Sequence, residues 1–552
     1  MNGFLTARSL WDRLESDHTP YLTRAREASA LTLPYLIPPE GASGATRLPT
    51  PHQSIGARGV INVSSKLLMS LFPPSVPFFS LQVDEGLLMK SIREMLENAG
   101  LVDEEQASTG QLSQAAEQMT VKIREETKQS VLSSEHRIAM EFDNKAYRSP
   151  LHAALQHLVV GGNVATFERK DGSLRMFSLP NYRCDRRPNG RVDTVIVRET
   201  MHPGQVPEEL RHVSANAPKI YGGPVEHKPV TLYTCAKHLG NDKYEVWQEV
   251  EGESKASERL YPFGSKPIEW EDLPLDAIPM NQEDEGSAYG RGMVEAYQGD
   301  LESLDGLMQN ILEGSANASR LLWLVNPHSQ FRTRVKDLAT APNGAFRIGS
   351  AEDVTALTLD KGADFSIAWS TAQDIKSRLE QAFLLNQPRE AERVTAEEIR
   401  ERAAQLEDTL GGTYSNLAVR LQMPMVRRIM RRLEREGRLN EMPEGVVQPK
   451  VVAGLEALGR GHELNRMRAF AAEGAQTLGP ETFAAHVNGT EWLLRVATAA
   501  GIDAAGVIKS QEEVLQERQQ QNQQAIMEKG TPNAVSALGK IASSDAQGGP
   551  TQ

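Results

Sequence analysis

The stretch that decides the fold is Tyr289–Arg320, YGRGMVEAYQGDLESLDGLMQNILEGSANASR. Its apolar residues recur at spacings of three and four, the period of one helix face; they are Val294, Tyr297, Leu301, Leu304, Met308 and Ile311. The pattern predicts a single helix over residues 286–320, which at 1.5 Å per residue would be about 50 Å long. Three acidic residues, Glu295, Glu302 and Glu313, fall on the opposite face.

Upstream of this helix the pattern changes from helical to strand-like. Residues 1–180 are expected to be mostly helical, with one helix ending at Pro73-Pro74 and another at Gly161-Gly162. From Val164 to Glu199 the apolar period shifts towards two, around a turn at Pro188-Asn189-Gly190. This predicts strands joined by a hairpin.

Residues 203–285 are expected to form a small β-rich insert. A short helix is predicted over residues 207–213, and residues 230–253 alternate like a hairpin around Gly240-Asn241-Asp242. Several prolines then break the pattern before the long helix begins.

Downstream, residues 327–367 are predicted to be irregular and strand-like, and a helix is predicted over 370–385. A capping box formed by Thr395 and Glu398 starts a new helix, which Gly411-Gly412 and Pro424 are expected to kink. Further helices are predicted over residues 461–477, 480–500 and 510–529. A tail rich in Gly, Ser and Gln follows and is expected to be disordered.

Length and composition exclude several classes of protein. The chain has 552 residues, enough for roughly three to four domains or one large multi-lobed subunit. Its net charge of −13 argues against a protein that coats nucleic-acid phosphates with its whole surface. Cys184 and Cys235 cannot form a disulfide framework and are typical of a reducing compartment. No stretch is apolar enough for a membrane span, and no secretion signal is expected.

Motifs for catalysis are missing from the sequence. It contains no phosphate-binding loop, dinucleotide fingerprint, zinc-protease motif or serine-hydrolase motif, and no Cys/His cluster with zinc-ligand spacing. We therefore expect a protein that is not an enzyme and that needs no cofactor or metal.

Two charged features are candidate functional groups. The acidic face of the helix is either a solvated surface or a wall that repels a passing polyanion. Arg389 and Arg393 either contact phosphates or belong to a helix connector in which they pair with Glu390 and Glu392.

A third charged feature is the arginine-rich segment 425–438. Its spacing predicts a basic ridge that faces nucleic acid or, as we favour, an acidic neighbouring subunit. The ridge consists of Arg427, Arg428, Arg431, Arg432, Arg435 and Arg438.

Several segments resemble the portal, or head-to-tail connector, of short-tailed phages of the autographivirus type. Their collinear order over roughly residues 5–465 carries the resemblance, since none is a catalytic signature. They are PYLTRAR (20–26), QSIGARG (53–59), KLLMSLFP (66–73), LVVGGN (158–163), YGRG (289–292), GDL (299–301), LVNP (324–327), ERVTAEEIR (392–400), LEDTLGGTY (406–414) and GLEALGRG (454–461).

The resemblance implies an α+β, mainly α portal fold with a wing, a two-helix stem, a β-rich clip and a helical crown, assembled as a ring. The implied parts are an N-terminal wing (1–202), a first stem helix (203–217), the clip (218–285), a second stem helix (286–320), a wing segment (321–424) with a channel loop (386–394) and the kinked helix, a crown (425–505), and a Gln-rich C-terminal helix with a disordered tail (506–552).

The resemblance also implies a function: a ring, usually of twelve copies, at a capsid vertex, through which double-stranded DNA is packaged and ejected. The implied partners are the terminase large subunit, a tail adaptor, the major capsid and scaffolding proteins, and internal core or ejection proteins, with no membrane. The expected location is the virion, and the host cytoplasm during assembly. Arg389, Arg393 and the three glutamates would line the channel. The alternatives are a tail or adaptor ring of the same virion, and a packaging enzyme, for which the sequence lacks a phosphate-binding loop.

Overall fold

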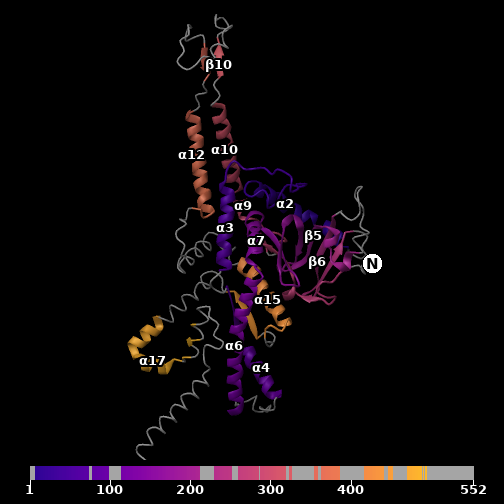
Figure 1. Ribbon diagram of the computed structural model, residues 1–552, viewed down its shortest axis with the longest axis vertical. Coiled ribbons are helices and arrows are strands. Elements are labelled where there is room, and N and C mark those ends of the chain that lie inside the picture. The colour runs from indigo at the N-terminus through magenta and orange to yellow at the C-terminus, as the bar shows by residue number, and fades with distance from the viewer. Residues whose placement is uncertain are drawn as a thin grey trace, which may run out of the picture. The chain divides into compact units, whose positions relative to one another are not determined.

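The computed structural model describes most of the chain and divides it into two compact units. The first unit comprises Met1–Pro73 with Ile138–Leu439, and the second Pro74–Arg137 with Asn440–Gln552. Helices outweigh strands (Figure 1), which confirms the expected α+β, mainly α class. The described residues are 6–73, 78–98, 114–211, 229–251, 259–284, 286–318, 322–325, 354–357, 362–385, 416–439, 446–451 and 469–487, with a few single residues beyond these.

Helix α7 (Arg148–Gly161) lies at the centre of the helical layer of the first unit. Helices α2 (Glu15–Ala30) and α3 (Ile55–Leu71) pack against it. As predicted, α7 ends at its two glycines, because Gly162 takes the left-handed conformation with φ +71°. A Cβ at this position would also lie 2.3 Å from the carbonyl carbon of Arg291, so both the backbone and the neighbouring segment require glycine.

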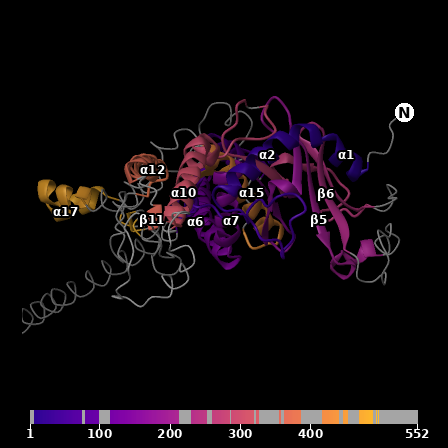
Figure 2. The same cartoon turned by 90° about the horizontal axis from the view of Figure 1, so that it is seen from above.

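A five-stranded antiparallel sheet, in the order β4-β5-β6-β7-β8, forms the β core of the first unit. Side chains alternate between its faces: Val195 and Val197 pack in one buried cluster, whereas Ile196 packs with Trp11 of α1 (Ala7–Arg13) in another. Seen from above, α1 and α2 lie beside β5 and β6 (Figure 2). The strands are β4 (Tyr182–Arg186), β5 (Val192–Met201), β6 (Val230–Gly240), β7 (Lys243–Val250) and β8 (Ile268–Glu269).

The prediction of a separate β-rich insert over residues 203–285 is wrong for the strands that the structure describes. β6 pairs with β5 from Thr194↔Lys237 to Met201↔Val230, so it belongs to the same sheet as the preceding hairpin. β9 (Leu275–Pro279) pairs with β2 (Asn163–Glu168), which also pairs with β3 (Leu174–Ser178). The alternating pattern reveals a strand, but it does not specify which strand is its partner.

The short helix predicted over residues 207–213 is described only in part. Glu208–Leu210 forms a 3-10 turn, and Arg211, its last described residue, is α-helical. Val206 is extended, as expected of a residue that precedes a proline.

The helix predicted over residues 286–320 is shorter and interrupted. Arg291 forms a β-bridge with Asn281, α9 covers only Met293–Ala296, and α10 runs over Gln298–Ala318. A tertiary contact helps to keep the first residues extended: the amide side chain of buried Asn163 donates to the Gly290 oxygen at 2.7 Å and accepts from the Gly290 nitrogen at 2.8 Å.

Helix α12 (Gly362–Ala382) packs along α10, and two short strands lie between them in the chain (Figure 1). These strands, β10 (Leu322–Val325) and β11 (Val354–Leu357), pair antiparallel. α12 begins at residue 362, earlier than the predicted 370. The region expected to be irregular to residue 367 therefore already contains its first turns.

Contacts at both ends show that α10 and α12 run antiparallel. Asp300 near the start of α10 pairs with Arg378 near the end of α12 at 3.2 Å. Towards the other end, a Cβ on Gly314 would lie 2.5 Å from the ring of Phe365. The glycine therefore permits the two helices to approach closely.

The helix changes type next to Pro424, where a kink is expected. A π-helical segment, Ala418–Gln422, precedes α15 (Met423–Arg435), and Pro424 lies in the first turn of α15. The predicted capping box and Gly411-Gly412 lie outside the described residues. Helix α15 packs within the first unit, whose last residue is Leu439, so the change of unit falls later than the expected start of a crown at residue 425.

The second unit joins segments that are far apart in the sequence. Strand β1 (Phe79–Val83) pairs antiparallel with β12 (Val447–Val451). Helix α4 (Glu85–Asn98) buries Leu88, Ile92 and Leu96 at helical spacing. Helix α17 covers Pro480–His486, and α6 (Gln114–Asn144) begins in this unit. The predicted C-terminal helix and tail, residues 506–552, lie outside the described residues.

Searches of the described ranges for two further features gave no match. No helix there is long and apolar enough to cross a membrane. No group of three or more His, Cys, Asp or Glu side chains there is placed to hold a metal ion.

Candidate functional site

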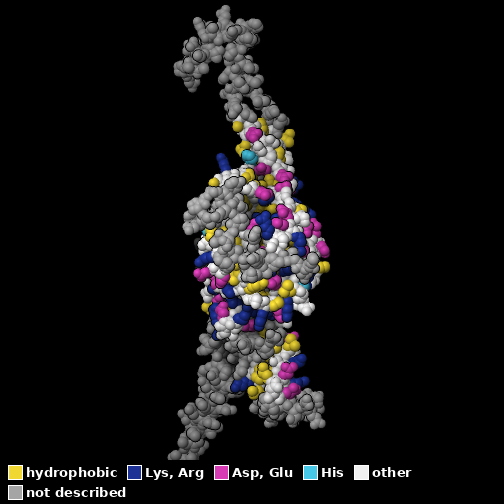
Figure 3. Space-filling view, turned by 90° about the vertical axis from the view of Figure 1, so that its right-hand side faces the viewer, with side chains coloured by type: hydrophobic (Ala, Val, Ile, Leu, Met, Phe, Trp, Pro, Cys, Tyr) yellow, Lys and Arg dark blue, Asp and Glu magenta, His cyan; other side chains and the backbone are white. Residues whose placement is uncertain are grey.

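Helix α15 carries the densest group of candidate residues. Its apolar side chains, among them Val426, Ile429 and Leu433, are buried and fasten the helix to the first unit. The arginines occupy the positions between them and point to two sides of the helix. Charged side chains of both signs are interspersed over the face of the molecule shown in Figure 3.

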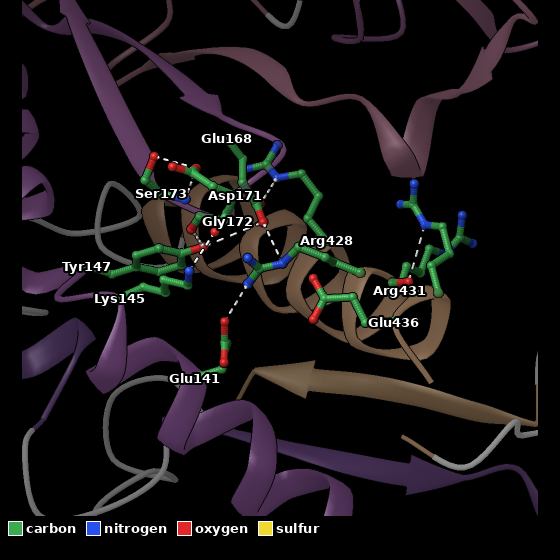
Figure 4. A network of polar contacts seen from close by, with 12 residues as sticks. Glu141, Lys145, Tyr147, Glu168, Asp171, Gly172, Ser173, Arg428, Arg431 and Glu436 are labelled. Atoms are coloured by element: carbon green, nitrogen blue, oxygen red, sulfur yellow. Dashed lines mark hydrogen bonds and ion pairs between the residues drawn. The ribbon is translucent and has the colours of Figure 1, made fainter. Parts of the chain in front are cut away.

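Arg428 and Arg432 lie against two buried carboxylates. Figure 4 labels the two carboxylates, Glu141 and Glu168, together with Arg428. The Nε of Arg428 is 3.5 Å from Glu168 Oε2, and its Nη1 donates to the Leu273 oxygen at 3.1 Å. The Nε of Arg432 is 3.5 Å from Glu168 Oε1, and its Nη2 is 3.3 Å from Glu141 Oε1. The side chains of Glu141 and Glu168 are only 4% and 7% exposed. These two arginine charges are therefore compensated inside the chain.

Tyr147 and Gly172 complete this buried network. The Tyr147 hydroxyl donates to the Gly172 oxygen at 2.5 Å and lies 3.5 Å from Glu168 Oε1. Burial raises the pKa of Glu168, and the two neighbouring guanidinium groups oppose that shift. Burial also raises the pKa of Tyr147. Gly172 has φ +75°, which favours glycine, and a Cβ there would lie 1.0 Å from Arg432 Nη1, so a larger residue would have to displace the guanidinium from its carboxylates.

The outer arginines of α15 pair with one short acidic segment. Arg431 contacts Glu271 at 2.5 Å and Asp272 at 3.1 Å. Arg427 lies 3.8 Å from Glu271, and Arg435 lies 3.7 Å from Asp272. The expectation that these arginines form a ridge for nucleic acid or for a neighbouring subunit stays a prediction, and within one chain the arginines already form ion pairs. Each has an acidic partner within its own unit.

The sequence located the arginines but missed their partners. Helical spacing alone places the arginines on α15, whereas Glu141, Glu168 and the acids at residues 271 and 272 come from three other segments. Arg431 and Glu271, for example, are 160 positions apart. The one local signal was the acidic run Glu269-Trp-Glu-Asp272 before the prolines.

The three predicted acidic residues have different environments. Glu295 of α9 is paired with Arg24 at 3.3 Å and with Arg291 at 3.1 Å, and its side chain is 17% exposed. Because two arginines compensate its charge, Glu295 is a weaker candidate than Glu302 and Glu313 for a carboxylate that repels a passing polyanion. Glu302 and Glu313 on α10 are exposed and accept hydrogen bonds from glutamines four residues earlier, at 2.8 and 2.9 Å.

The two arginines of the predicted channel loop, Arg389 and Arg393, lie outside the described residues, which stop at Leu385 and resume at Asn416.

A comparison with protein families identifies the class to which this fold and these sites belong. A family model described as bacteriophage head to tail connecting protein matches residues 5–508. The chain belongs to this family of head-to-tail connectors.

Curated relatives narrow the class to phage portal proteins. The chain is 33% identical over 556 residues to the portal protein of Escherichia phage T7, covering 99% of this chain and 95% of the relative. It is 32% identical to the portal protein of Enterobacteria phage T3, covering 97% and 93%. These matches confirm the resemblance to portals of the autographivirus type, and the chain is a portal, or head-tail connector, protein.

A solved structure titled "Virion of native gene transfer agent (GTA) particle" matches 81% of this chain and 89% of its own. Its sequence identity is 11% and its TM-score 0.33, values too low to carry an argument here.

Proposed function

We propose that this chain assembles into a ring, of twelve copies by family likeness, at a capsid vertex, and that double-stranded DNA passes through the ring during packaging and ejection. The family match over residues 5–508 is the observation that carries the proposal. The ring docks the terminase motor first and the tail adaptor later, and contacts capsid, scaffolding and internal core proteins. ATP hydrolysis belongs to the motor, since this sequence has no phosphate-binding loop.

The antiparallel pair α10 and α12 supports a new assignment of the stem and clip. In the family's plan two stem helices flank the clip. In this chain, α10 ends at Ala318 and α12 begins at Gly362, and the strands β10 and β11 lie between them. We assign α10 and α12 as the stem and residues 319–361 as the clip. These replace the expected stem helix at 203–217 and the clip at 218–285, because the described strands there belong to the sheet of the first unit.

The channel assignment follows from the stem. Residues 386–394 follow α12 in the sequence after three further residues, and we keep the assignment of Arg389 and Arg393 to the channel loop that the family likeness implies. Glu302 and Glu313 are exposed on the other stem helix. A conduit must let DNA slide: each phosphate neutralised by an arginine strengthens salt-sensitive binding, whereas carboxylates on the wall repel the duplex. A few arginines per copy would grip the DNA briefly, and the acidic wall would release it.

Charge reversal of the loop tests this function. We expect a phage that carries Arg389→Glu and Arg393→Glu to assemble rings of normal size by electron microscopy, but to stall in packaging or to leak packaged DNA. The matched control reverses two exposed cations elsewhere, Arg47 and Lys90. Normal packaging and retention by the loop variant would refute the loop assignment. A purified chain that never forms a ring would refute the function itself, and a ring that binds the tail adaptor but never a terminase would favour the adaptor alternative.

A further inference from the structure

An open hollow of about 530 Å³ lies beside the buried arginine network. Its walls come from three segments of the first unit: the β2–β3 turn with Arg169 and Lys170, the segment from Phe263 to Pro274, and the solvent-facing side of α15. A single water needs only about 10–15 Å³ of such space, so the hollow is many times larger than one water. It therefore has room for a small hydrated ion.

The lining of the hollow carries a surplus of positive charge. Six cationic side chains face four carboxylates, which leaves two positive charges in excess although the whole chain has a net charge of −13. The cations are Arg169, Lys170, Lys266, Arg428, Arg432 and Arg435. The carboxylates are Glu168, Glu269, Asp272 and Glu436.

Three of the cations differ from the arginines of α15. Arg169, Lys170 and Lys266 are exposed, and none of the ion pairs found among the described residues involves them. The arginines of α15, in contrast, all have acidic partners. The three exposed cations can therefore bind an external anion, whereas the charges of Arg428 and Arg432 are already compensated by Glu141 and Glu168.

The turn that carries Arg169 and Lys170 is held in place by hydrogen bonds. The Asp171 carboxylate accepts from the Ser173 nitrogen at 2.9 Å and from its hydroxyl at 2.6 Å. Lys145 Nζ donates to the Asp171 oxygen at 2.6 Å, and the Gly172 nitrogen donates to the Arg169 oxygen at 2.9 Å. A site on a fixed backbone loses less conformational entropy when it binds a ligand.

We propose that this hollow is a binding site for a phosphate-class oxyanion, held by Lys170, Lys266 and Arg169. A compact anion with several negative oxygens fits a cluster of separate cations, because lysine and arginine form charge-assisted hydrogen bonds with phosphate oxygens. The site does not depend on ring formation, since every lining residue belongs to one unit of one chain. The anion is either free phosphate or pyrophosphate, or a phosphate of a nucleic-acid backbone.

Calorimetric titration of the purified protein with sodium pyrophosphate and with inorganic phosphate tests the site. We expect saturable binding of one anion per chain, and a dissociation constant at least tenfold higher in the double variant Lys170→Gln, Lys266→Gln. The control Arg47→Gln, Lys90→Gln removes the same charge from exposed positions elsewhere and should bind as the parent does. Thermal unfolding without anion checks that both variants are folded.

A competition experiment distinguishes the two sources of the anion. If a short DNA duplex displaces pyrophosphate from the parent protein, and binds the Lys170→Gln, Lys266→Gln variant more weakly than it binds the parent, the backbone of DNA is the ligand. If pyrophosphate binds and the duplex does not compete, the ligand is a free anion. No saturable binding of either probe, or equal binding by the parent and the folded site variant, would overturn the proposal.

Discussion

Arg432→Ala is the most informative perturbation of the buried network. Arg432 lies 3.3 Å from Glu141 and 3.5 Å from Glu168, whose side chains are 4% and 7% exposed. Removing one partner of a buried ion pair costs about 3–5 kcal/mol, because a charge is left buried without compensation. Both carboxylates keep a second arginine, since Arg438 is 2.9 Å from Glu141 and Arg428 is 3.5 Å from Glu168. We therefore expect the Arg432→Ala substitution to lower the free energy of unfolding by about 3 kcal/mol, the lower end of that range.

The control is Arg435→Ala on the same helix. The side chain of Arg435 is 65% exposed and lies 3.7 Å from Asp272, so its removal should cost about 0–1 kcal/mol. Urea unfolding followed by tryptophan fluorescence measures both variants, and Trp270 lies on the segment that packs against α15. Arg432→Lys should fall between the two, because it keeps the charge but loses the planar fork. Equal free energies of unfolding for Arg432→Ala and Arg435→Ala, within about 1 kcal/mol, would refute the assigned role of the network.

Two further predictions concern pH and backbone geometry. Burial lowers the pKa of His157 from 6.5 to about 4. Between these two pH values the unfolded chain binds a proton at His157 that the folded chain does not bind, so the folded state is fully stable above pH 6.5 and loses stability as the pH falls towards 4. The free energy of unfolding should fall by up to about 3 kcal/mol over this range. In urea unfolding at a series of pH values, His157→Leu should lose less stability over this range than the parent, and an unchanged slope would contradict the assignment. Gly172→Ala should lower the free energy of unfolding by more than about 2 kcal/mol in the same assay, because its φ of +75° disfavours alanine and its Cβ would displace Arg432. The control Gly204→Ala, with no atom within 4 Å of its Cβ, should cost less than about 0.5 kcal/mol. Similar losses for both variants would argue against the close approach of Gly172 and Arg432.

Local sequence was enough for features that depend on a few neighbouring residues. The end of α7 at Gly161-Gly162 and the turn between β6 and β7 were predicted correctly. The turn residues Asn241 and Asp242 both have positive φ, which asparagine and aspartate tolerate better than most residues. Pro424 marked a helix boundary because a proline cannot continue the backbone hydrogen-bond pattern of a helix interior. The collinear motifs also identified the family, since their order survives where single residues diverge.

Local sequence failed where a distant segment decides the conformation or the partner. The apolar period continues through residues 290–297, yet Asn163 holds Gly290 extended and the long helix is interrupted. The alternating pattern of β6 does not specify that β5 is its neighbour, so a hairpin within one sheet was taken for a separate insert.

The arginines of α15 show most clearly which properties follow from local sequence and which depend on tertiary contacts. The sequence by itself determined that they lie on one amphipathic helix, because helical periodicity is a property of consecutive residues. Only the tertiary structure decided that their charges are compensated within the chain and that an open basic hollow forms next to them. Those carboxylates and cations come from segments more than 100 residues away, and the free energy of an ion pair depends on distance and burial in space rather than on separation along the chain.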